Sequence, residues 1–524
     1  MQNDSRGDRL SWGDTVFLHL ERAGMPLNVA SVCVFDGQIS FRAFSQFVKS
    51  KLPLLPRYLK RVVGAPLNIG LPSWEYDPTF DVRNHLHEVT LKRGTGNELK
   101  SLAGRILSKV MDRQHPLWDL TLVHGLEGHR SALIARLHHC LADGIAGVGI
   151  MNVLLDANPE APRLPRSKLQ LQVPPPRAPL AALVGGFVDS YSDFVQRILS
   201  ALADLLSMAE RVAANGGAVP SDEFSRLLPE ITAFTERLRF NVPYRGPQKF
   251  AWADISLADV KEIRHVFGTS VNDVILTLVT ATIRRYSELH GERVKGRLFR
   301  MMVPVNLRAS DSPSEWGNRI SLVPVTIPLD IRDPRKLLAA VHKRTEFLKR
   351  VHAPELVSLA GGLIGMFPTA LQAAVGPLAS QLPITPFNLV CTNVPGPQYP
   401  LYLLGHKMLR WYPYVPIGGE MALNCAILSY DGRLAFGFSG DVHAAPDLQR
   451  LETFLQVSFT ELREAAGAHP PRKPTKAAQV KARVVAKSSS ATVRAPVPIS
   501  ISRSAAGERS ASSEERKVPT PLIA

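Results

Sequence analysis

The sequence predicts an α/β protein made of two halves of similar size. Its 524 residues are 45% hydrophobic and 21% charged, a globular composition with enough chain for two core-bearing domains. Strand-like and helix-like stretches alternate over about the first 160 residues, and a second α/β region starts near residue 250. No repeat of fixed period relates the two halves. Collagen-like, fibrous and wholly disordered classes are excluded by this composition.

The N-terminal half contains one helix and two strands with clear local patterns. Residues 98–112 are predicted to be helical, and their apolar side chains share one face: Leu99, Leu102, Ala103, Ile106, Leu107 and Val110. Residues 120–123 and 131–137 are predicted strands. We expect a loop carrying His138 and His139 next, followed by a helix that begins near Ile145.

A proline-rich stretch divides the chain. Residues 158–180 contain seven prolines and are predicted to be an extended linker. Residues 181–239 have a helical pattern. In the second half, Ser270 and Asp273 predict a capping box at the start of a helix over residues 271–286, and residues 300–305 predict a buried strand. The expected organisation is a domain over 1–157, a linker over 158–249, a domain over 250–468 and a tail over 469–524.

The residue content of several segments limits where the protein acts. Residues 356–405 contain no Asp, Glu, Lys, Arg or His, but prolines interrupt them too often for a membrane span. We expect buried core there, with an amphipathic helix that touches a membrane. The N-terminus lacks the layout of a signal peptide, and the four cysteines form no CxxC pair. A cytoplasmic, soluble or peripheral protein without a disulfide framework or cysteine zinc site is expected.

The positive charge is unevenly distributed. Of the formal charge of +16, residues 471–524 contribute +8, with eleven Lys or Arg against three Glu. This segment has almost no aromatic residues, so we expect a disordered basic tail. The remaining body is mildly basic, which suits an anionic small substrate or membrane surface. No sequence signature of specific nucleic-acid binding is present.

One motif points to chemistry: His138, His139, Asp143 and Gly144, in the pattern HHxxxDG. Adjacent side chains of an extended segment point to opposite sides, so one histidine is expected to act and the other to pack. A neutral imidazole can take a proton from a hydroxyl that attacks an acyl carbon. Asp143 could hold the loop through a salt bridge or orient the histidine, and Gly144 would keep space open beside the imidazole.

Other chemistries have no support in the sequence. A metal site needs a third ligand at helical or hairpin spacing, and the sequence shows none. The patterns GxSxG, Walker A and GxGxxG are also missing, which disfavours serine hydrolases, P-loop proteins and Rossmann domains. A structural role for the histidine pair is the alternative.

The motif resembles the active-site motif of CoA-dependent acyltransferases related to chloramphenicol acetyltransferase and to nonribosomal-peptide condensation domains. Further segments narrow the resemblance to the bacterial wax ester synthase/diacylglycerol O-acyltransferase family. These segments, in chain order, are LSWGDTVFLHLE, PLNVASVCVFDG, PSWEYDPTFDVRNHL, PLWDL, SVNDVIL, MMVPVNLR and CTNVPGPQYPLYLLGHKM. The resemblance extends from about Leu10 to Arg463, and only the tail lies outside it.

The resemblance implies two chloramphenicol-acetyltransferase-like α/β domains with mixed sheets, joined by a helical linker, with the active site in a channel between them. It implies that His139 is the general base, that His138 supports it and that Asp143 is mainly structural. It also places Pro116, Leu117 and Trp118 near the acyl-acceptor channel, and Asn272 and Asp273 at a second motif. A buried tryptophan and a helix cap are the structural alternatives for these last two motifs.

The implied reaction is acyl transfer from acyl-CoA to diacylglycerol or a fatty alcohol, without a cofactor or an acyl-enzyme. Asn272, Thr392 or a backbone amide could stabilise the oxyanion, and Cys140 is expected to be a packing residue. The apolar product suggests attachment to the inner membrane face or a lipid droplet. Three alternatives stay open: another hydroxyl or amine acceptor, such as an intermediate on a carrier protein; a non-catalytic lipid-binding or lipid-droplet protein; and nucleic-acid binding through the tail.

Overall fold

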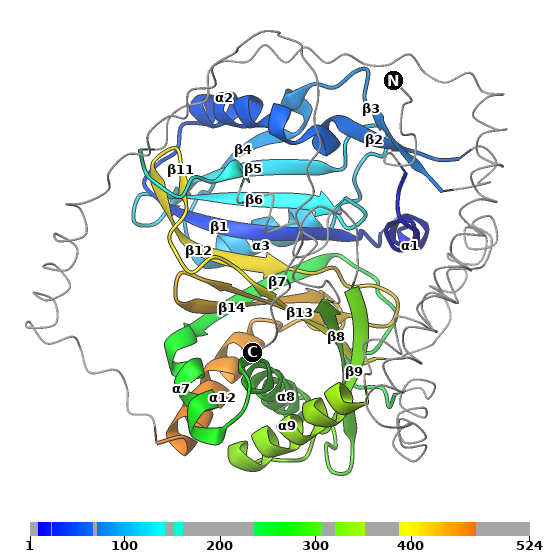
Figure 1. Cartoon of the computed structure of the whole chain (residues 1–524), viewed down its shortest axis with the longest axis vertical. Coiled ribbons are helices and arrows are strands. Elements are labelled where there is room, and N and C mark those ends of the chain that lie inside the picture. Colours follow the sequence, from blue (N-terminus) through cyan, green and yellow to red (C-terminus); the bar gives the residue numbers. More distant parts are fainter. Residues whose placement is uncertain are drawn as a thin grey trace, which may run out of the picture. The chain divides into compact units, whose positions relative to one another are not determined.

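The structure is a computed structural model that describes residues 9–22, 24–65, 71–141, 151, 153–160, 235–306, 320–351 and 387–467. The chain forms two compact units, residues 1–468 and 469–524, and all described residues belong to the first. The described residues of this unit form two six-stranded sheets and a short two-stranded sheet (Figure 1).

The N-terminal sheet has the strand order β11-β12-β1-β6-β5-β4. Its strands are β1 (Asn28–Asp36), β4 (Leu86–Thr90), β5 (Trp118–Leu126), β6 (Arg130–His138), β11 (Tyr402–Leu403) and β12 (His406–Tyr414). The sheet is mixed because β4 and β5 are parallel, whereas the other pairs are antiparallel. Strands β11 and β12 come from far along the chain, so this sheet is not made from the first half of the sequence alone.

Short helices and a two-stranded sheet accompany the N-terminal sheet. The helices are α1 (Trp12–Leu20), α2 (Phe41–Lys51) and α3 (Gly96–Leu107), with 3₁₀ helices at Leu52–Leu54, Pro56–Leu59 and Val82–Asn84. The small sheet pairs β2 (Lys60–Val63) with β3 (Ser73–Tyr76). Ser11, Ser40 and Thr95 cap the three α-helices through their side-chain oxygens.

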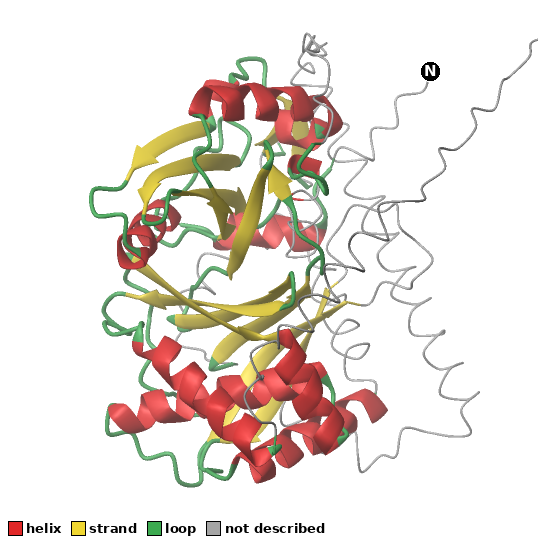
Figure 2. Cartoon of the chain, turned by 90° about the vertical axis from the view of Figure 1, so that its left-hand side faces the viewer, coloured by secondary structure: helices red, strands yellow, loops and turns green. Residues whose placement is uncertain are grey.

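The C-terminal sheet has the order β7-β14-β13-β10-β8-β9. Its strands are β7 (Gln248–Ser256), β8 (Leu298–Asn306), β9 (Ile320–Pro328), β10 (Leu389–Pro395), β13 (Leu423–Tyr430) and β14 (Arg433–Asp441). The helices described beside it are α7 (Leu257–Phe267), α8 (Val271–Leu289), α9 (Pro334–Arg350) and α12 (Arg450–Ala465). Figure 2 shows these helices gathered on one side of the sheet.

Helix α8 forms the centre of the C-terminal core. It begins with a complete capping box, in which Ser270 and Asp273 bond to each other's backbone N–H. Its residues from Asp273 to Arg284 are all buried, and α8 contacts α7, α9 and α12. Because it is covered on every side, α8 is a rigid element whose N-terminus is held in place.

The N-terminal and C-terminal sheets, with helix α3, meet at two close backbone approaches. A Cβ atom on Gly104 of α3 would lie 2.8 Å from the carbonyl oxygen of Gln248 at the start of β7. A Cβ on Gly437 of β14 would overlap the carbonyl of Pro413 in β12. Glycine is needed at both positions because the backbones meet there.

Local predictions of helices and strands are confirmed, with corrected ends. The predicted helix over 98–112 is α3, which starts at Gly96 and ends at Leu107, where the Ser108 hydroxyl bonds to the carbonyl of Gly104. Val110 therefore lies outside the helix and is exposed, contrary to expectation. The predicted strands over 120–123, 131–137 and 300–305 are the centres of β5, β6 and β8, and α8 extends to Leu289.

Several predictions concern residues that the structure describes in part or not at all. Only the beginning and the end of the 158–249 linker are described, and the tail and the helix expected near Ile145 lie almost wholly outside the described residues. Within the charge-free stretch 356–405, the described end forms β10 and β11 rather than a helix. The domain division at 157 and 250 stays a prediction. No single described helix is both long and apolar enough to cross a membrane, although α7 and α8 together pass such a test as a bent pair.

Candidate active site

The histidine pair lies at the end of β6, where this strand passes β1. His138 is the last residue of the strand and is in register with Asn28, so it does not lie in the predicted loop. Its backbone N–H donates to Leu117, 3.0 Å away, and the N–H of His139 donates to Leu27 at 2.9 Å. The pairing of β6 with β1 thus continues to this point and fixes the backbone that carries both imidazoles.

His138 is completely buried and its tautomer is defined by its contacts. The backbone N–H of Cys140 donates to His138 Nδ1 at 3.1 Å. Because an N–H can only donate, Nδ1 carries no proton and the proton of the neutral ring is on Nε2. Nε2 lies 3.4 Å from the carboxylate oxygen Oε1 of Glu21. His138 therefore connects the turn after β6 to the residue that follows α1.

Glu21 is a buried carboxylate with partners on several sides. Its Oε1 accepts the backbone N–H of Leu27 at 3.1 Å, and its Oε2 accepts Arg113 Nη2 at 3.0 Å. Arg113 also donates to the carbonyl of Leu18 at 2.8 Å. Burial raises the pKa of Glu21, but the contacts with His138, Leu27 and Arg113 outweigh it and hold the pKa below its ordinary value. Glu21 is therefore ionised at neutral pH and fixes the end of α1 beside His138.

His139 has a different environment. Its ring is half-buried and stacks on Phe17 of α1, with ring centroids 3.7 Å apart and planes inclined by 12°. Burial lowers the pKa of His139 to about 4, its own backbone carbonyl opposes this shift, and the nearby His138 adds to it. Its Nδ1 is buried and has no hydrogen-bond partner among the described residues. At neutral pH this imidazole is therefore uncharged and able to accept a proton.

Cys140 packs into the apolar cluster behind the histidines. Its side chain is buried with Leu10, Leu18, Trp74, Met111 and Leu117. Burial raises the pKa of the Cys140 thiol well above its ordinary value, so the thiolate is not populated near neutral pH. These observations agree with the expectation that Cys140 is a packing residue.

The Pro116–Leu117–Trp118 segment lies in the core, directly beside the end of β6. Leu117 is fully buried and accepts the N–H of His138 through its carbonyl. Pro116 is also buried, and its carbonyl accepts the N–H of Trp118 at 2.9 Å. The Trp118 indole stacks on His85 with centroids 4.5 Å apart and donates to the carbonyl of Tyr58 at 2.8 Å. The contacts of this segment are those of a structural support for the β6 end.

Asn272 and Asp273 form a second cluster at the start of α8. The buried Asp273 carboxylate accepts the Ser270 N–H at 2.9 Å, His342 Nδ1 at 2.9 Å and the Thr345 hydroxyl at 2.7 Å. Burial raises the pKa of Asp273, but these hydrogen bonds dominate and lower it. Asn272 Oδ1 accepts Asn393 Nδ2 at 3.5 Å. Asp273 therefore caps α8 and connects it to α9, as its structural interpretation predicts.

The structure tests the predicted residues unequally. It brings Leu117 next to the histidine pair, because the backbone N–H of His138 bonds to the Leu117 carbonyl. Asn272 and Asp273 form a separate cluster, with partners on β10 and α9. Asp143 and Gly144 lie outside the described residues, so their roles stay predictions. In the part of the chain that the structure describes, no three His, Cys, Asp or Glu side chains converge as a metal site would need.

Four residues of these two clusters escaped prediction as site residues: Phe17, Glu21, Arg113 and His342. Glu21 offered one signal, because it ends the apolar run VFLHLE, and a charge that closes such a run is buried only when it is paired. The partners themselves leave no local signal, since Arg113 and His342 lie far along the chain from the groups they contact.

Solved structures share this architecture. A wax ester synthase/diacylglycerol acyltransferase from Marinobacter aquaeolei VT8 superposes with a TM-score of 0.61 at 23% identity, covering 88% of this chain and all of the other. The first condensation domain of the calcium-dependent antibiotic synthetase gives a TM-score of 0.55 at 13% identity, covering 90% and 98%. The fold is thus the two-domain, chloramphenicol-acetyltransferase-like fold that the resemblance implied.

The chain belongs to the wax ester synthase/diacylglycerol acyltransferase family. The family's catalytic domain matches residues 10–275, and its C-terminal domain matches residues 316–463. The chain is also 27% identical to two proteins of Mycobacterium tuberculosis H37Rv named as probable diacylglycerol O-acyltransferases, tgs1 and tgs2. These matches cover 83% of this chain and 91% of tgs1, and 88% of this chain and 100% of tgs2. It is therefore an acyltransferase of this family, as the resemblance predicted.

Proposed function

We propose that this protein transfers a long-chain acyl group from acyl-CoA to diacylglycerol, to a fatty alcohol, or to both, with His139 as the general base. Family membership and the names of the relatives support the substrate classes. The observation that carries the choice of base is the difference in exposure within the pair: the His139 ring is half-buried and stacks on Phe17, whereas His138 is fully buried. Burial also lowers the pKa of His139, which keeps its imidazole unprotonated at neutral pH.

The proposed reaction is a single displacement in a ternary complex. His139 takes the proton of the acceptor hydroxyl while the oxygen attacks the thioester carbonyl. The tetrahedral intermediate then collapses, the carbon–sulfur bond breaks, and protonated His139 returns the proton to the CoA thiolate. An ester and free CoA are formed without a cofactor. Because Nδ1 is buried, Nε2 is the atom that exchanges the proton in this mechanism.

The neighbours of His139 support this assignment of roles. Phe17 restrains the His139 ring by stacking, and the Glu21–His138–Cys140 contacts fix the backbone that carries it. Orientation of this kind raises the rate of an intramolecular proton transfer. His138 cannot take the same role, because it is fully buried and its Nδ1 is already bonded to the N–H of Cys140.

The site of action follows from the chemistry of the product. A triacylglycerol or wax ester is apolar, so we propose that the protein acts at the cytoplasmic membrane face or a lipid droplet. Each Lys or Arg close to an anionic surface contributes about 1 kcal/mol of attraction. The eleven Lys and Arg of residues 471–524 are the candidates for this contact.

The experiment measures the release of free CoA thiol from palmitoyl-CoA by the purified protein. Hexadecanol, dioleoylglycerol and no acceptor are compared, together with His139→Ala and Cys140→Ala. Acceptor-dependent release that His139→Ala abolishes and Cys140→Ala retains is expected, and the two acceptors are ranked by rate. A folded protein without acceptor-dependent release would contradict the proposal, and an acyl-cysteine in the mass spectrum would contradict the single displacement.

A further inference from the structure

The segment that contains α2 and the 3₁₀ helices after it has an unusual charge composition. Residues 37–74 contain no Asp, Glu or His but six Lys or Arg, which gives a formal charge of +6. Residues 1–470 together carry +8, so most of the net charge of the chain outside its tail lies in this one segment. The basic residues are Arg42, Lys49, Lys51, Arg57, Lys60 and Arg61.

The exposed side chains of this segment follow one side of α2. Arg42, Gln46 and Lys49 are exposed, and their spacing of four and three residues places them on one face of the helix. The line continues beyond the helix end into Pro53 and Leu54, which are also exposed. Leu54 is 59% exposed, more than any other large hydrophobic side chain of the described residues. We call these five residues the α2 surface.

The outward position of Leu54 is fixed by the packing around it. Leu52 and Leu55 are only 2% and 5% exposed, and they belong to the N-terminal core together with Phe44 and Val48. The backbone on both sides of Leu54 is therefore anchored in the core. Figures 1 and 2 show α2 at the end of the N-terminal half that lies away from the C-terminal sheet. An apolar tip beside basic residues is thus presented at this end of the molecule.

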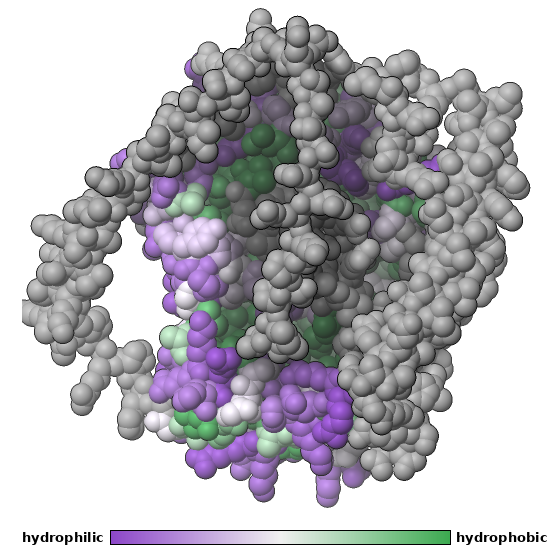
Figure 3. Space-filling model, viewed as in Figure 1, coloured by the Kyte–Doolittle hydropathy of each residue, from purple (hydrophilic) through white to green (hydrophobic). Residues whose placement is uncertain are grey.

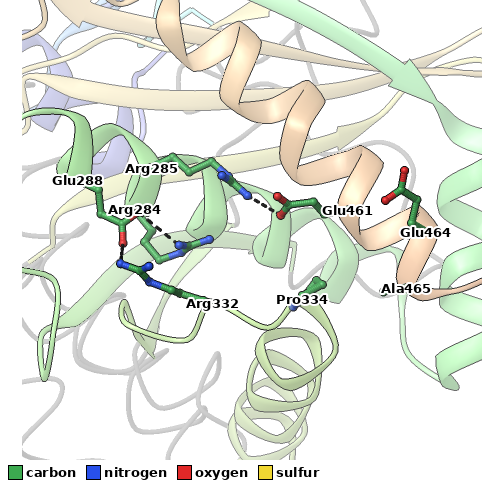
Figure 4. Close-up of a pocket in the computed structure, with 8 residues that line it drawn as sticks. All are labelled: Arg284, Arg285, Glu288, Arg332, Pro334, Glu461, Glu464 and Ala465. Atoms are coloured by element: carbon green, nitrogen blue, oxygen red, sulfur yellow. Dashed lines mark hydrogen bonds and ion pairs between the residues drawn. The ribbon is translucent and has the colours of Figure 1, made fainter.

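The helical end of the C-terminal half shows a different arrangement of charge. Hydrophilic side chains predominate there on the face shown in Figure 3. The three arginines that line a hollow among the helices are matched by three glutamates (Figure 4): Arg284, Arg285 and Arg332 with Glu288, Glu461 and Glu464. Near α2, Lys51 pairs with Asp156, whereas neither Arg42 nor Lys49 forms an ion pair with a described residue. The positive charge of the α2 surface is therefore available to a partner.

We propose that the α2 surface docks on a lipid layer with anionic headgroups, so that Leu54 enters the layer and Arg42 and Lys49 contact the headgroups. An exposed apolar side chain flanked by cations suits such an interface, because the apolar group leaves water while the cations are attracted to the headgroups. A nucleic acid would attract the same cations but would offer no apolar phase to Leu54. The inference rests on the proposed action at a lipid surface and names the folded part that makes the contact.

Two hydrogen bonds connect this region to the histidine site. The Trp118 indole donates to the carbonyl of Tyr58, 2.8 Å away, in the 3₁₀ helix that follows Leu54. The residue before Trp118 is Leu117, whose carbonyl accepts the backbone N–H of His138. Docking through α2 therefore brings the lipid layer to the half of the molecule that carries the proposed base. This placement suits an acceptor that is supplied from lipid.

The test measures binding of the full chain to sedimented vesicles of phosphatidylcholine, alone or in an equimolar mixture with phosphatidylglycerol. We expect tighter binding to the mixed vesicles, weakened by salt. The double change Arg42→Gln and Lys49→Gln should raise the Kd for mixed vesicles at least about tenfold. The control is Lys261→Gln with Arg264→Gln, two exposed positions on α7 that remove the same charge. Equal losses in the two double variants would contradict the proposal.

Leu54→Gln tests the apolar part of the contact. We expect it to raise the Kd about fivefold or more, whereas Leu289→Gln, at a leucine that is 50% exposed on α8, should leave the Kd unchanged. Unchanged thermal unfolding shows that each variant is folded. Residues 471–524 are intact in every variant, so binding equal to that of the wild type in the α2 variants would assign the contact to the tail and overturn the proposal. No binding by the wild type would overturn it as well.

A fluorescent label tests directly whether position 54 enters the lipid. The four native cysteines are all buried, so Leu54→Cys introduces an exposed thiol that a polarity-sensitive dye can label selectively. We expect the dye emission to shift to the blue on mixed vesicles for Leu54→Cys and to stay unchanged for Leu289→Cys. Absence of a shift at position 54 would contradict its insertion. These measurements contain no acyl-CoA, so failure to dock and failure to transfer an acyl group are separate results.

Discussion

The end of β6 and the start of α8 each contain a contact between a carboxylate and a histidine, but only the end of β6 carries a second histidine. Each contains a buried carboxylate that contacts a histidine, Glu21 with His138 and Asp273 with His342. Each carboxylate also accepts a backbone N–H, and each has a lowered pKa. The β6 end alone adds a further histidine, His139, which is half-buried and uncharged at neutral pH.

This comparison separates structural support from chemistry. A carboxylate–histidine pair looks like catalytic machinery, yet in both places the carboxylate accepts several hydrogen bonds from the protein, which ties it to a structural role. Under the proposed mechanism, proton transfer falls instead to the neighbouring residue, His139. We infer that the α8 start fixes the geometry of the second half, whereas the β6 end presents a base.

The largest expected difference is in turnover. His139→Ala should lower acceptor-dependent thiol release by about 10²- to 10⁴-fold, the usual contribution of a positioned general base. His342→Ala, the matched change at the α8 start, should leave turnover close to that of the wild type. Steady-state rates with both acceptors check this prediction. Equal losses in the two variants would remove the distinction between the two regions.

The next effect is on stability and should be alike in both regions. Glu21→Ala and Asp273→Ala each remove a buried carboxylate that accepts several hydrogen bonds, and each donor left unsatisfied costs about 1 to 3 kcal/mol. Urea denaturation measures the change. Glu21→Gln keeps the size of the side chain and serves as the control.

Only Glu21→Ala should also lower the turnover of the molecules that remain folded, because Glu21 contacts His138 beside the base. If Asp273→Ala lowered turnover as strongly, with the fold retained, the α8 start would have a direct role in the reaction.

As a third effect, we expect His139 to make the stability of the protein depend on pH. Its pKa is about 4 in the folded chain and near 6.5 when unfolded, so the unfolded chain takes up a proton first as pH falls. The contribution of His139 to the free energy of unfolding should therefore decrease as pH falls from about 6.5 to 4, and it should be constant above about pH 6.5. Denaturation at several pH values tests this.

The pH slope should become smaller in His139→Ala without vanishing, because burial also lowers the pKa of His19 and His85. The acid limb of kcat/KM should likewise lie below pH 6.5. A limb at or above 6.5 that disappears in His139→Ala would contradict the low pKa of His139.

The smallest expected effect concerns the helix caps. Ser270 accepts the N–H of Asp273 at 3.1 Å in a complete capping box, and Ser11 accepts the N–H of Asp14 at the same distance in α1. Ser270→Ala and Ser11→Ala should each reduce the free energy of unfolding by about 1 kcal/mol. Thermal unfolding checks both. A much larger loss in Ser270→Ala alone would show that the cap also supports the buried contacts of Asp273.

The elements that could be predicted from the sequence are those with local causes. The apolar face of α3, the capping box of α8 and the apolar runs of β5, β6 and β8 depend on residues a few positions apart. The motif around His138 and His139 is likewise a local pattern, and the structure places it at the end of β6. The errors were at boundaries, such as the exposed Val110 and the placement of His138 in a loop.

The sequence by itself therefore determined the class of fold, the family and the histidine pair. Only the tertiary structure decided which groups surround each histidine. Strand β12 joins the N-terminal sheet from a segment more than 250 residues beyond β6, and His342 reaches Asp273 from another helix. The pKa of His139 also depends on tertiary burial beside Phe17. Such contacts carry no local signal, because burial and charge pairing arise when distant segments pack together.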